Sequence, residues 1–313
     1  MTPGTEPMSG EKEHFMENEK LKHGTLVRGI GSFYTVRDSS HLEYTVRCKK
    51  KFRRAGMTPM IGDEVIFSPG QGEEHGWLED ILPRKTVCLR PPVANINCLA
   101  IVTAPVPEPD LLLVDKQISR AVGQKMKVLL IVNKCDLDPG FYERIRDEYA
   151  CTGIPVMAVS AKEKTGIELL TAAIGNETLC CFTGQSGAGK STLLNALLDL
   201  DLETGDISRK ISRGKNTTRH TELIEKNGIR VMDTPGFNLL EAENELRPEN
   251  LKDRYPEFLP YEGLCRFREC LHDREPGCAV LEAVKKSEIS EGRISRYHML
   301  LEEAREVWRE RYD

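Results

Sequence analysis

The sequence contains no long hydrophobic run. Its 313 residues are 39% hydrophobic and 30% charged, as in globular proteins, but no apolar stretch approaches the roughly 18 residues that a membrane-spanning helix needs. The N-terminal stretch MTPGTEPMSGEKEHFMENEK is mostly polar and lacks the apolar core of a signal peptide. We therefore expect a cytoplasmic protein without membrane contacts, and a disordered leader over residues 1–21.

The sequence also lacks a disulfide framework and an excess of positive charge. Ten cysteines spread over a chain without a secretory signal are typical of reduced thiols. A formal net charge of −5 argues against wholesale binding of nucleic acid. One local exception is RCKKKFRR at 47–54, which is either a solvated hairpin face or a contact for a phosphate backbone.

Short alternating runs dominate residues 22–90. Four of them are rich in β-branched residues and are separated by Gly, Pro and Asp: GTLVRGIGSFYTVR, LEYTVRCKKKF, GDEVIFSP and GWLEDIL. Several short strands in this length predict a small β-barrel of the OB or SH3-like kind. The Pro- and Arg-rich segment PRKTVCLRPPVAN at 83–95 has the composition of a linker.

Strand-like and helix-like segments alternate in residues 91–245. Amphipathic segments at 110–122 and 139–150 lie between apolar runs of the buried parallel-strand type, which are INCLAIVTA, KVLLIVNK, IPVMAVSA, TLCCFTGQ and IRVMDTPG. This alternation predicts a doubly wound α/β domain. Residues 246–313 are polar and helical, with an apolar stripe of Ile294, Tyr297, Leu301, Ala304 and Trp308. The predicted fold is thus multidomain α/β: barrel, α/β domain and helical module.

A phosphate-binding loop follows one of the predicted strands. GQSGAGKST fits G-x-x-x-x-G-K-[ST] between an apolar run and the helix KSTLLNALLDL. Backbone N–H groups at the helix N-terminus would hold phosphates, Lys190 would reach the β- and γ-phosphates, and Ser191 would bind magnesium. The predicted nucleotide contacts are Gly184, Gln185, Ser186, Gly187, Ala188, Gly189, Lys190, Ser191 and Thr192.

A second phosphate-sensing element is DTPG at 233–236, which ends another apolar run. It therefore lies at the carboxyl edge of the predicted sheet, where the ligand sites of such folds lie. We expect Asp233 to hold magnesium, through water, and the Gly236 amide to sense the γ-phosphate.

Two short motifs are typical of guanine recognition. In NKCD, the Asp136 carboxylate can accept hydrogen bonds from guanine N1–H and its 2-amino group, Asn133 can bond the ring edge and nearby backbone, and the Lys134 stem can cover the base. SAK, after the next strand, can present a backbone N–H to guanine O6. The predicted base contacts are Asn133, Lys134, Cys135, Asp136, Ser160, Ala161 and Lys162.

These motifs stand in an unusual order. The base-reading loop comes first, followed by SAK, the phosphate loop, a threonine-rich segment and DTPG. The sequence therefore predicts a circularly permuted GTPase. In this order the chain leaves DTPG toward the C-terminal module, so a shift at Gly236 could move that module directly.

The C-terminal module carries a dense group of metal ligands. Cys265, Cys270, His272 and Cys278 have the spacing C-x4-C-x-H-x5-C. Three thiolates and one imidazole suit tetrahedral zinc, and four protein ligands leave no position for a substrate. We therefore predict a structural zinc site.

Together these features resemble the ribosome small-subunit-dependent GTPase A family of bacterial assembly factors. GKNTTRHTEL at 214–223 and DTPGF are especially similar, and the Cys/His spacing matches the zinc motif of that family. The resemblance covers nearly the whole chain. It implies binding to the small ribosomal subunit late in its maturation, with hydrolysis of GTP to GDP stimulated by the ribosome.

One departure concerns the catalytic water. The family usually has a histidine just before the paired threonines, where this chain has Asn216, and Phe237 after DTPG cannot orient water as a glutamine would. Slow intrinsic hydrolysis is expected, with His220 as a substitute candidate. Thr217 or Thr218 should bind magnesium in the GTP state, and the sequence does not decide between them.

Three functional hypotheses follow. The leading one is a monomeric GTP-driven switch that docks on rRNA through its barrel and zinc module and is released after hydrolysis. The phosphate-contact candidates are Lys49, Lys50, Lys51, Arg53 and Arg54. A small-molecule kinase is disfavoured, because it has no use for NKCD with SAK. An RNA-binding module with a weakly active or relic GTPase core remains as the alternative.

Overall fold

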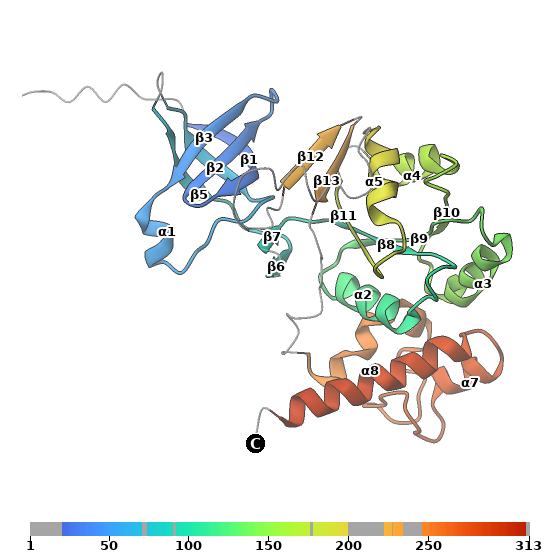
Figure 1. Cartoon of the computed structure of the whole chain (residues 1–313). Coiled ribbons are helices and arrows are strands. Elements are labelled where there is room, and N and C mark those ends of the chain that lie inside the picture. The colour runs from blue at the N-terminus through green and yellow to red at the C-terminus, as the bar shows by residue number, and fades with distance from the viewer. Residues whose placement is uncertain are drawn as a thin grey trace, which may run out of the picture.

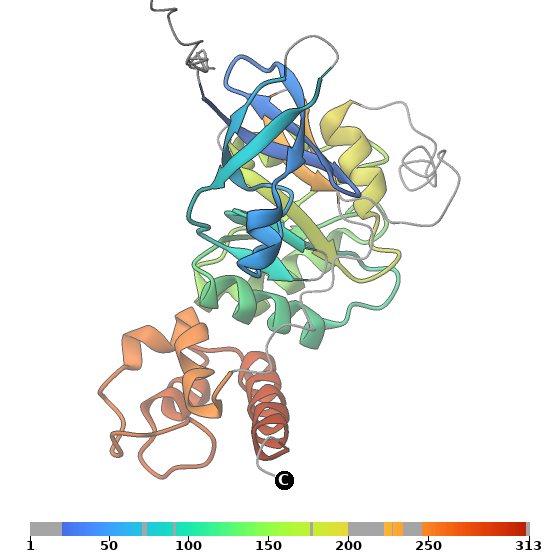
Figure 2. The same cartoon turned by 90° about the vertical axis from the view of Figure 1, so that its left-hand side faces the viewer.

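The computed structural model describes residues 21–70, 74–89, 92–175, 178–199, 222–226, 228–233 and 246–310. They form three parts, which Figure 1 shows side by side, while Figure 2 shows the C-terminal module apart from the other two. A β-barrel lies beside a central α/β sheet, and a helical C-terminal module lies under one face of that sheet. Residues 1–20 of the predicted leader lie outside the described residues.

The barrel is built from five strands: β1 (Lys22–Ile30), β2 (Phe33–Asp38), β3 (Glu43–Cys48), β4 (Glu64–Ser68) and β5 (Gly76–Ile81). Their order is β1-β2-β3-β5-β4, and β4 pairs back to β1, which closes the barrel. The β3–β5 pair is parallel and the other pairs are antiparallel. Alternate side chains such as Val36, Val46 and Leu78 are fully buried inside. This topology confirms the predicted OB-like barrel.

One interpretation of the basic run at 47–54, a solvated hairpin face, is wrong. It ends β3 and then forms the short helix α1 (Lys50–Arg54) between β3 and β4. The helix forms here because Phe52, only 2% exposed, packs into the barrel core while Lys50 and Lys51 stay exposed. Lys49 is partly neutralised by Glu79, whose carboxylate lies 2.5 Å from its ammonium group.

The segment at 83–95 is not a free linker, contrary to its composition. It contains the hairpin β6 (Val87–Leu89) and β7 (Pro92–Ala94), whose Cys88 and Val93 are buried in the core of the α/β domain. The Ala94 N–H donates to the Ile61 carbonyl at 2.9 Å. Buried side chains and backbone bonds fix this connection between barrel and sheet.

The central sheet contains the five predicted parallel strands, β8 (Cys98–Thr103), β9 (Lys127–Val132), β10 (Val156–Ala158), β11 (Leu179–Gly184) and β13 (Ile229–Asp233). They lie in the order β10-β9-β8-β11-β13. The chain runs outward from β8 in one direction through β9 and β10, and then returns to β11 on the other side. The sheet therefore reverses its winding between β8 and β11, the place where doubly wound folds bind ligands.

Helices cover both faces of this sheet (Figure 1). α2 (Leu111–Gly123) and α3 (Pro139–Tyr149) pack on one face, while α4 (Ile167–Ile174) and α5 (Lys190–Leu198) pack on the other. The antiparallel strand β12 (Glu222–Lys226) was not predicted. It pairs with β13 and, through a bridge between Glu222 and Arg28, with β1, so the barrel and the sheet are continuous.

The described part of the C-terminal module contains three short 3-10 helices and two α-helices. The 3-10 helices are η3 (Pro248–Asn250), η4 (Lys252–Arg254) and η5 (Pro256–Tyr261), and the α-helices are α7 (Ala279–Lys285) and α8 (Glu291–Arg309). Ile294, Tyr297 and Leu301 of the predicted stripe are buried in its core. Trp308 is half-exposed, with the guanidinium of Arg247 5.5 Å from its ring centroid. None of the helices that the structure describes is long and apolar enough to span a membrane.

A buried ionic cluster joins this module to the α/β domain. Arg293 of α8, which is 1% exposed, lies 2.6 Å from Asp115 of α2 and 2.6 Å from Glu257 of η5. Arg296 bridges Asp115 and Glu148 at 2.6 Å each, and the Tyr149 hydroxyl donates to Asp115 at 2.7 Å. We call these six residues the Arg293 cluster. Nothing in the linear sequence pointed to it.

Candidate nucleotide site and metal cluster

The phosphate loop connects β11 to α5 at the winding reversal of the sheet. Gly184, Gly187 and Gly189 have φ of 133°, 82° and 90°, values that favour glycine. A Cβ at Gly184 would collide with the Val102 carbonyl of β8, and one at Gly189 would collide with the Asn133 amide. Glycine is therefore required both for the turn and for the close approach of neighbouring loops.

Lys190 folds over the loop that precedes it. Its ammonium group donates to the carbonyl oxygens of Gly184 and Gln185 at 2.8 and 2.9 Å. Partial burial lowers the pKa of Lys190. The loop thus holds a cation at the position where the motif requires one for phosphate oxygens.

Asn133 links the NKCD loop to both other motifs. Its side chain is 1% exposed, its Nδ2 donates to the Ala188 carbonyl at 2.9 Å, and its Oδ1 accepts from the Ala161 N–H at 3.1 Å. A buried amide with partners at both ends is fixed in orientation. One side chain therefore locks the loops after β9, β10 and β11 together.

Asp136 is positioned by SAK. The Ser160 hydroxyl donates to its Oδ1 at 2.6 Å, and this bond is the main cause of a lowered Asp136 pKa, with Lys162 and Lys134 contributing. An aspartate is already ionised at neutral pH, and the lowered pKa keeps Asp136 ionised in more acid solution as well. The carboxylate can accept two hydrogen bonds from a guanine edge. The Lys134 ammonium donates to the Gly187 carbonyl at 2.7 Å, which joins the base loop to the phosphate loop.

Several contacts of this site were not found from the sequence. Gln185 accepts the Asp110 N–H at 3.0 Å, and the Lys134 ammonium also donates to the Val106 carbonyl at 2.8 Å, so the loop after β8 supports both motifs. Gln117 of α2 donates to Thr183 at 2.8 Å under the phosphate loop. Val106, Asp110 and Gln117 belong to no motif, so only their place in the fold reveals them.

The structure describes some of the other predicted site residues and leaves the rest outside the described ranges. Ser191 lies in the first turn of α5 with an exposed side chain, and Lys162 is also exposed. The backbone of Asp233 ends β13 at the same sheet edge. Asn216, Thr217, Thr218, His220, Gly236 and Phe237 lie outside the described residues.

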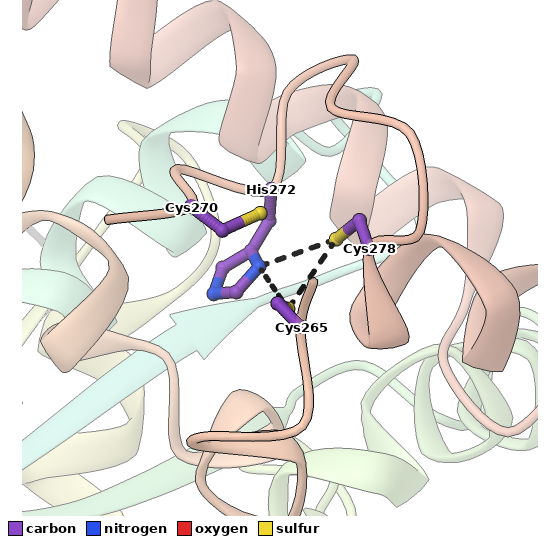
Figure 3. Close-up of side chains that lie close together, drawn as sticks. All are labelled: Cys265, Cys270, His272 and Cys278. Atoms are coloured by element: carbon purple, nitrogen blue, oxygen red, sulfur yellow. Dashed lines mark hydrogen bonds between the residues drawn. The ribbon is translucent and has the colours of Figure 1, made fainter. Parts of the chain in front are cut away.

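The four predicted metal ligands converge in the C-terminal module (Figure 3). Cys265 Sγ lies 3.9 Å from Cys278 Sγ and 3.6 Å from His272 Nδ1, which is 3.3 Å from Cys278 Sγ. All four ligand atoms, including Cys270 Sγ, lie within 4.8 Å of one another. Tetrahedral zinc with bonds of about 2.3 Å places two sulfurs about 3.8 Å apart. The donor set and its spacing fit zinc.

The surrounding backbone prepares this cluster for a metal. Burial lowers the pKa of His272, which keeps its imidazole neutral as a ligand must be. The Ala279 N–H donates to Cys265 Sγ at 3.3 Å. Glu275, which the sequence did not single out, accepts the N–H groups of Leu271 and Asp273 at 2.8 and 2.9 Å and so shapes the loop between two ligands.

Comparison with known proteins finds the same architecture in proteins of known family. The model of the RsgA GTPase family matches residues 81–243, and that of the RsgA N-terminal domain matches residues 23–78. The chain is 41% identical over 293 residues to the "Small ribosomal subunit biogenesis GTPase RsgA" of Ruminiclostridium cellulolyticum, covering 92% of this chain and 95% of that protein. It is 40% identical to the protein of the same name from Clostridium beijerinckii, covering 90% and 97%.

Two solved structures extend this likeness to three dimensions. YjeQ from Thermotoga maritima is 30% identical with a TM-score of 0.78, covering 91% of this chain and 98% of that one. YloQ, described as a circularly permuted GTPase, is 25% identical with a TM-score of 0.77, covering 93% and 97%. With the motif order, the closed barrel and the Cys/His cluster, these matches show that the chain belongs to the RsgA family of circularly permuted GTPases.

Proposed function

We propose that this protein is a late assembly factor of the small ribosomal subunit that docks on rRNA with GTP bound and is released after ribosome-stimulated hydrolysis. The observation that carries the nucleotide part is the convergence of three loops at one sheet edge through Asn133. The ribosomal part is supported by near full-length relatives that are named for small-subunit biogenesis.

Base recognition is assigned to the NKCD and SAK loops. Asp136, positioned by the Ser160 hydroxyl, accepts from guanine N1–H and the 2-amino group. Adenine offers no such pair of donors, so the loop selects guanine. Asn133, Lys134, Cys135, Ala161 and Lys162 complete the proposed base contacts.

Phosphate binding is assigned to the loop between β11 and α5. Lys190 stabilises charge that develops on the β- and γ-phosphates, and the loop N–H groups hold the remaining oxygens. Ser191 and Asp233 would hold magnesium, which neutralises phosphate charge when bound. Thr217 or Thr218 as a further magnesium ligand, and His220 beside the attacking water, are proposed from the sequence alone.

A structural role is proposed for zinc at Cys265, Cys270, His272 and Cys278. The metal would fix the loops before α7, and the barrel and this module would supply the rRNA contacts. Lys50, Lys51 and Arg54 of α1 are exposed as such contacts require, whereas the Lys49 charge is shared with Glu79.

The test is GTP hydrolysis by the purified protein, alone and with small ribosomal subunits, beside an Asn216→His variant. We expect slow hydrolysis alone and strong stimulation by the subunit. Stimulation of the variant only would mean that docking is retained while the catalytic water lacks its partner. If neither protein responds, the ribosome-activated function is wrong.

Replacing Lys190 by alanine is expected to lower the rate of GTP hydrolysis about 100-fold, because a positioned donor to the transferring phosphate is lost. The measurement is single-turnover hydrolysis at saturating GTP. Lys286→Ala, which removes an exposed lysine on the C-terminal module, is the matched control. Equal rates for the two variants would contradict the role of Lys190.

Replacing Asp136 by asparagine is expected to weaken GTP binding at least about tenfold, since charge-assisted hydrogen bonds contribute about 1.5–3 kcal/mol each. The asparagine amide can donate to the 2-oxo group of xanthine, so xanthosine triphosphate should bind better than GTP. Competition against a fluorescent guanine nucleotide measures both affinities. Glu163→Gln is the nearby control, and an unchanged preference for GTP would refute the assignment.

A further inference from the structure

A cavity of about 710 Å³ lies beside the metal cluster of the C-terminal module, and Cys265, Cys270 and His272 form part of its wall. The four ligands differ in their access to solvent. Cys270, His272 and Cys278 are buried, whereas Cys265 is only half-buried and follows Leu264, which is 67% exposed. Small molecules can therefore reach the cluster at the sulfur of Cys265.

The accessible sulfur has a second sulfur within reach. Cys265 Sγ lies 3.9 Å from Cys278 Sγ (Figure 3). The backbone next to the two cysteines is also paired, because the Arg266 N–H donates to the Gly277 carbonyl at 3.0 Å. A disulfide bond is about 2 Å long, so side-chain movements of about 2 Å suffice to join the two sulfurs. Neither strand of backbone has to separate from the other for this to happen.

Two other places in the fold show why access and a partner are both needed. Cys98 of β8 lies opposite Cys180 of β11, but both side chains are fully buried in the central sheet. Cys151, which follows α3, is half-buried like Cys265, and burial raises the pKa of its thiol. Cys151 is therefore mostly protonated at neutral pH, and the thiol is the less reactive form of cysteine.

We propose that Cys265 is a site of oxidation by hydrogen peroxide, and that the reaction joins it to Cys278 and disperses the metal cluster. Cysteines that bind a metal are deprotonated, and the thiolate is the form that peroxide oxidises. The Cys265 thiolate attacks one peroxide oxygen and becomes a sulfenic acid, while the O–O bond breaks and hydroxide leaves. The Cys278 thiolate then attacks the Cys265 sulfur and displaces a second hydroxide. Two thiolates thus give two electrons to one peroxide molecule.

The disulfide changes the module and spares the nucleotide site. It removes two of the four zinc ligands, and Cys270 and His272 alone cannot complete a tetrahedral site. The loops before α7 then lose the metal that would fix them, whereas the nucleotide loops lie in the central α/β domain. Oxidation should therefore end the subunit contacts of the module and leave GTP binding intact. This inference rests on the proposed function, which assigns both the zinc and the subunit contacts to the module.

The first test adds hydrogen peroxide to the zinc-loaded full-length protein at about pH 7.5. A chromogenic metal indicator follows zinc release, and peptide mapping by mass spectrometry identifies the disulfide. We expect one zinc ion to be released for each Cys265–Cys278 disulfide. Cys265 should be oxidised about tenfold faster than Cys151, because a thiol with a pKa of about 8.5 or more is at most about one-tenth ionised at this pH. Zinc retention, or zinc release without this disulfide, would overturn the proposal.

A matched pair of variants assigns the reaction to Cys265. Cys265→His and Cys270→His each keep four zinc ligands, but only Cys270→His keeps the reactive pair. After zinc content has been measured, Cys265→His should release zinc to peroxide at least about tenfold more slowly than Cys270→His. Equal rates would show that Cys265 is not the site. If Cys265→His does not hold zinc, the disulfide mapped in the unmodified protein decides, and Cys151→Ser, whose zinc release should be unchanged, is the control.

Measurements with small ribosomal subunits separate this proposal from the proposed function. The oxidised protein should bind GTP but lose stimulation by subunits, and dithiothreitol with zinc should restore it. If the oxidised protein is stimulated as before, the proposed function stands and the oxidation site has no such effect, which overturns the proposal. If the unmodified protein holds zinc that peroxide does not release, only the oxidation site is refuted. If it holds no zinc at all, the proposed zinc site and this proposal fail together.

Discussion

Replacing Cys278 by serine is expected to abolish zinc binding and to unfold the C-terminal module. Structural zinc sites contribute on the order of 10–16 kcal/mol of apparent binding free energy, which is also folding free energy. Here the cluster residues Cys270 and Cys278 are themselves part of the core of the module. Loss of the metal should therefore remove the contacts that hold η5, α7 and α8 together.

Hydrogen exchange and metal content measure this result. Amides in 246–310 should lose protection, while those of the central sheet between 98 and 199 should keep it. Chelation of the unmodified protein should give the same pattern. Cys48→Ser, which changes a half-buried cysteine of the barrel, is the matched control. A metal-free variant with native protection in the module would show that zinc is not structural here.

Replacing Arg293 by methionine is expected to lower the free energy of unfolding by about 3–5 kcal/mol. The cost arises because Asp115 and Glu257, both fully buried side chains, lose their shared cation. Asp115 keeps Arg296 and Tyr149, but Glu257 keeps no comparable charge partner among the described residues. Urea denaturation followed by circular dichroism measures the change.

A matched surface variant and a double variant make this prediction specific. Arg305→Met removes an arginine that is 31% exposed and pairs with Asp273 and Glu302, so it should cost about 0–1 kcal/mol. Adding Glu257→Gln to Arg293→Met removes the unpaired charge and should recover part of the loss. Similar costs for Arg293→Met and Arg305→Met would contradict the role of the Arg293 cluster.

The Arg293 cluster also bears on the predicted switch. The sequence predicts that the chain passes from DTPG toward the module, a path that lies outside the described residues. The structure shows a second connection, since α3 begins just after NKCD and ends at Tyr149, beside Asp115 and Arg293. Helix α3 thus connects the base-reading loop to the C-terminal module, in addition to the covalent path that the sequence predicts from DTPG.

The sequence by itself determined the parts whose chemistry is local. The phosphate loop, NKCD, SAK and the Cys/His cluster each lie within at most fourteen consecutive residues. The order of NKCD, SAK, the phosphate loop and DTPG alone indicated the permutation. The parallel strands were also predictable, because strands buried on both faces are continuous apolar runs. The barrel followed from short alternating strands, and its closure through β1 and β4 agrees with that expectation.

The tertiary structure decided what depends on residues far apart in the chain. Asn133 meets Ala188 across 55 positions, and Arg296 meets Asp115 across 181, so no local pattern marks either pair. The hairpin at 87–94 and the helix α1 were missed for the same reason. From composition alone, a polar or proline-rich segment is interpreted as a linker or an exposed face. In the folded chain, residues of these segments such as Val93 and Phe52 are buried in cores that other segments form. Burial, which is a property of the assembled chain, then outweighs local composition.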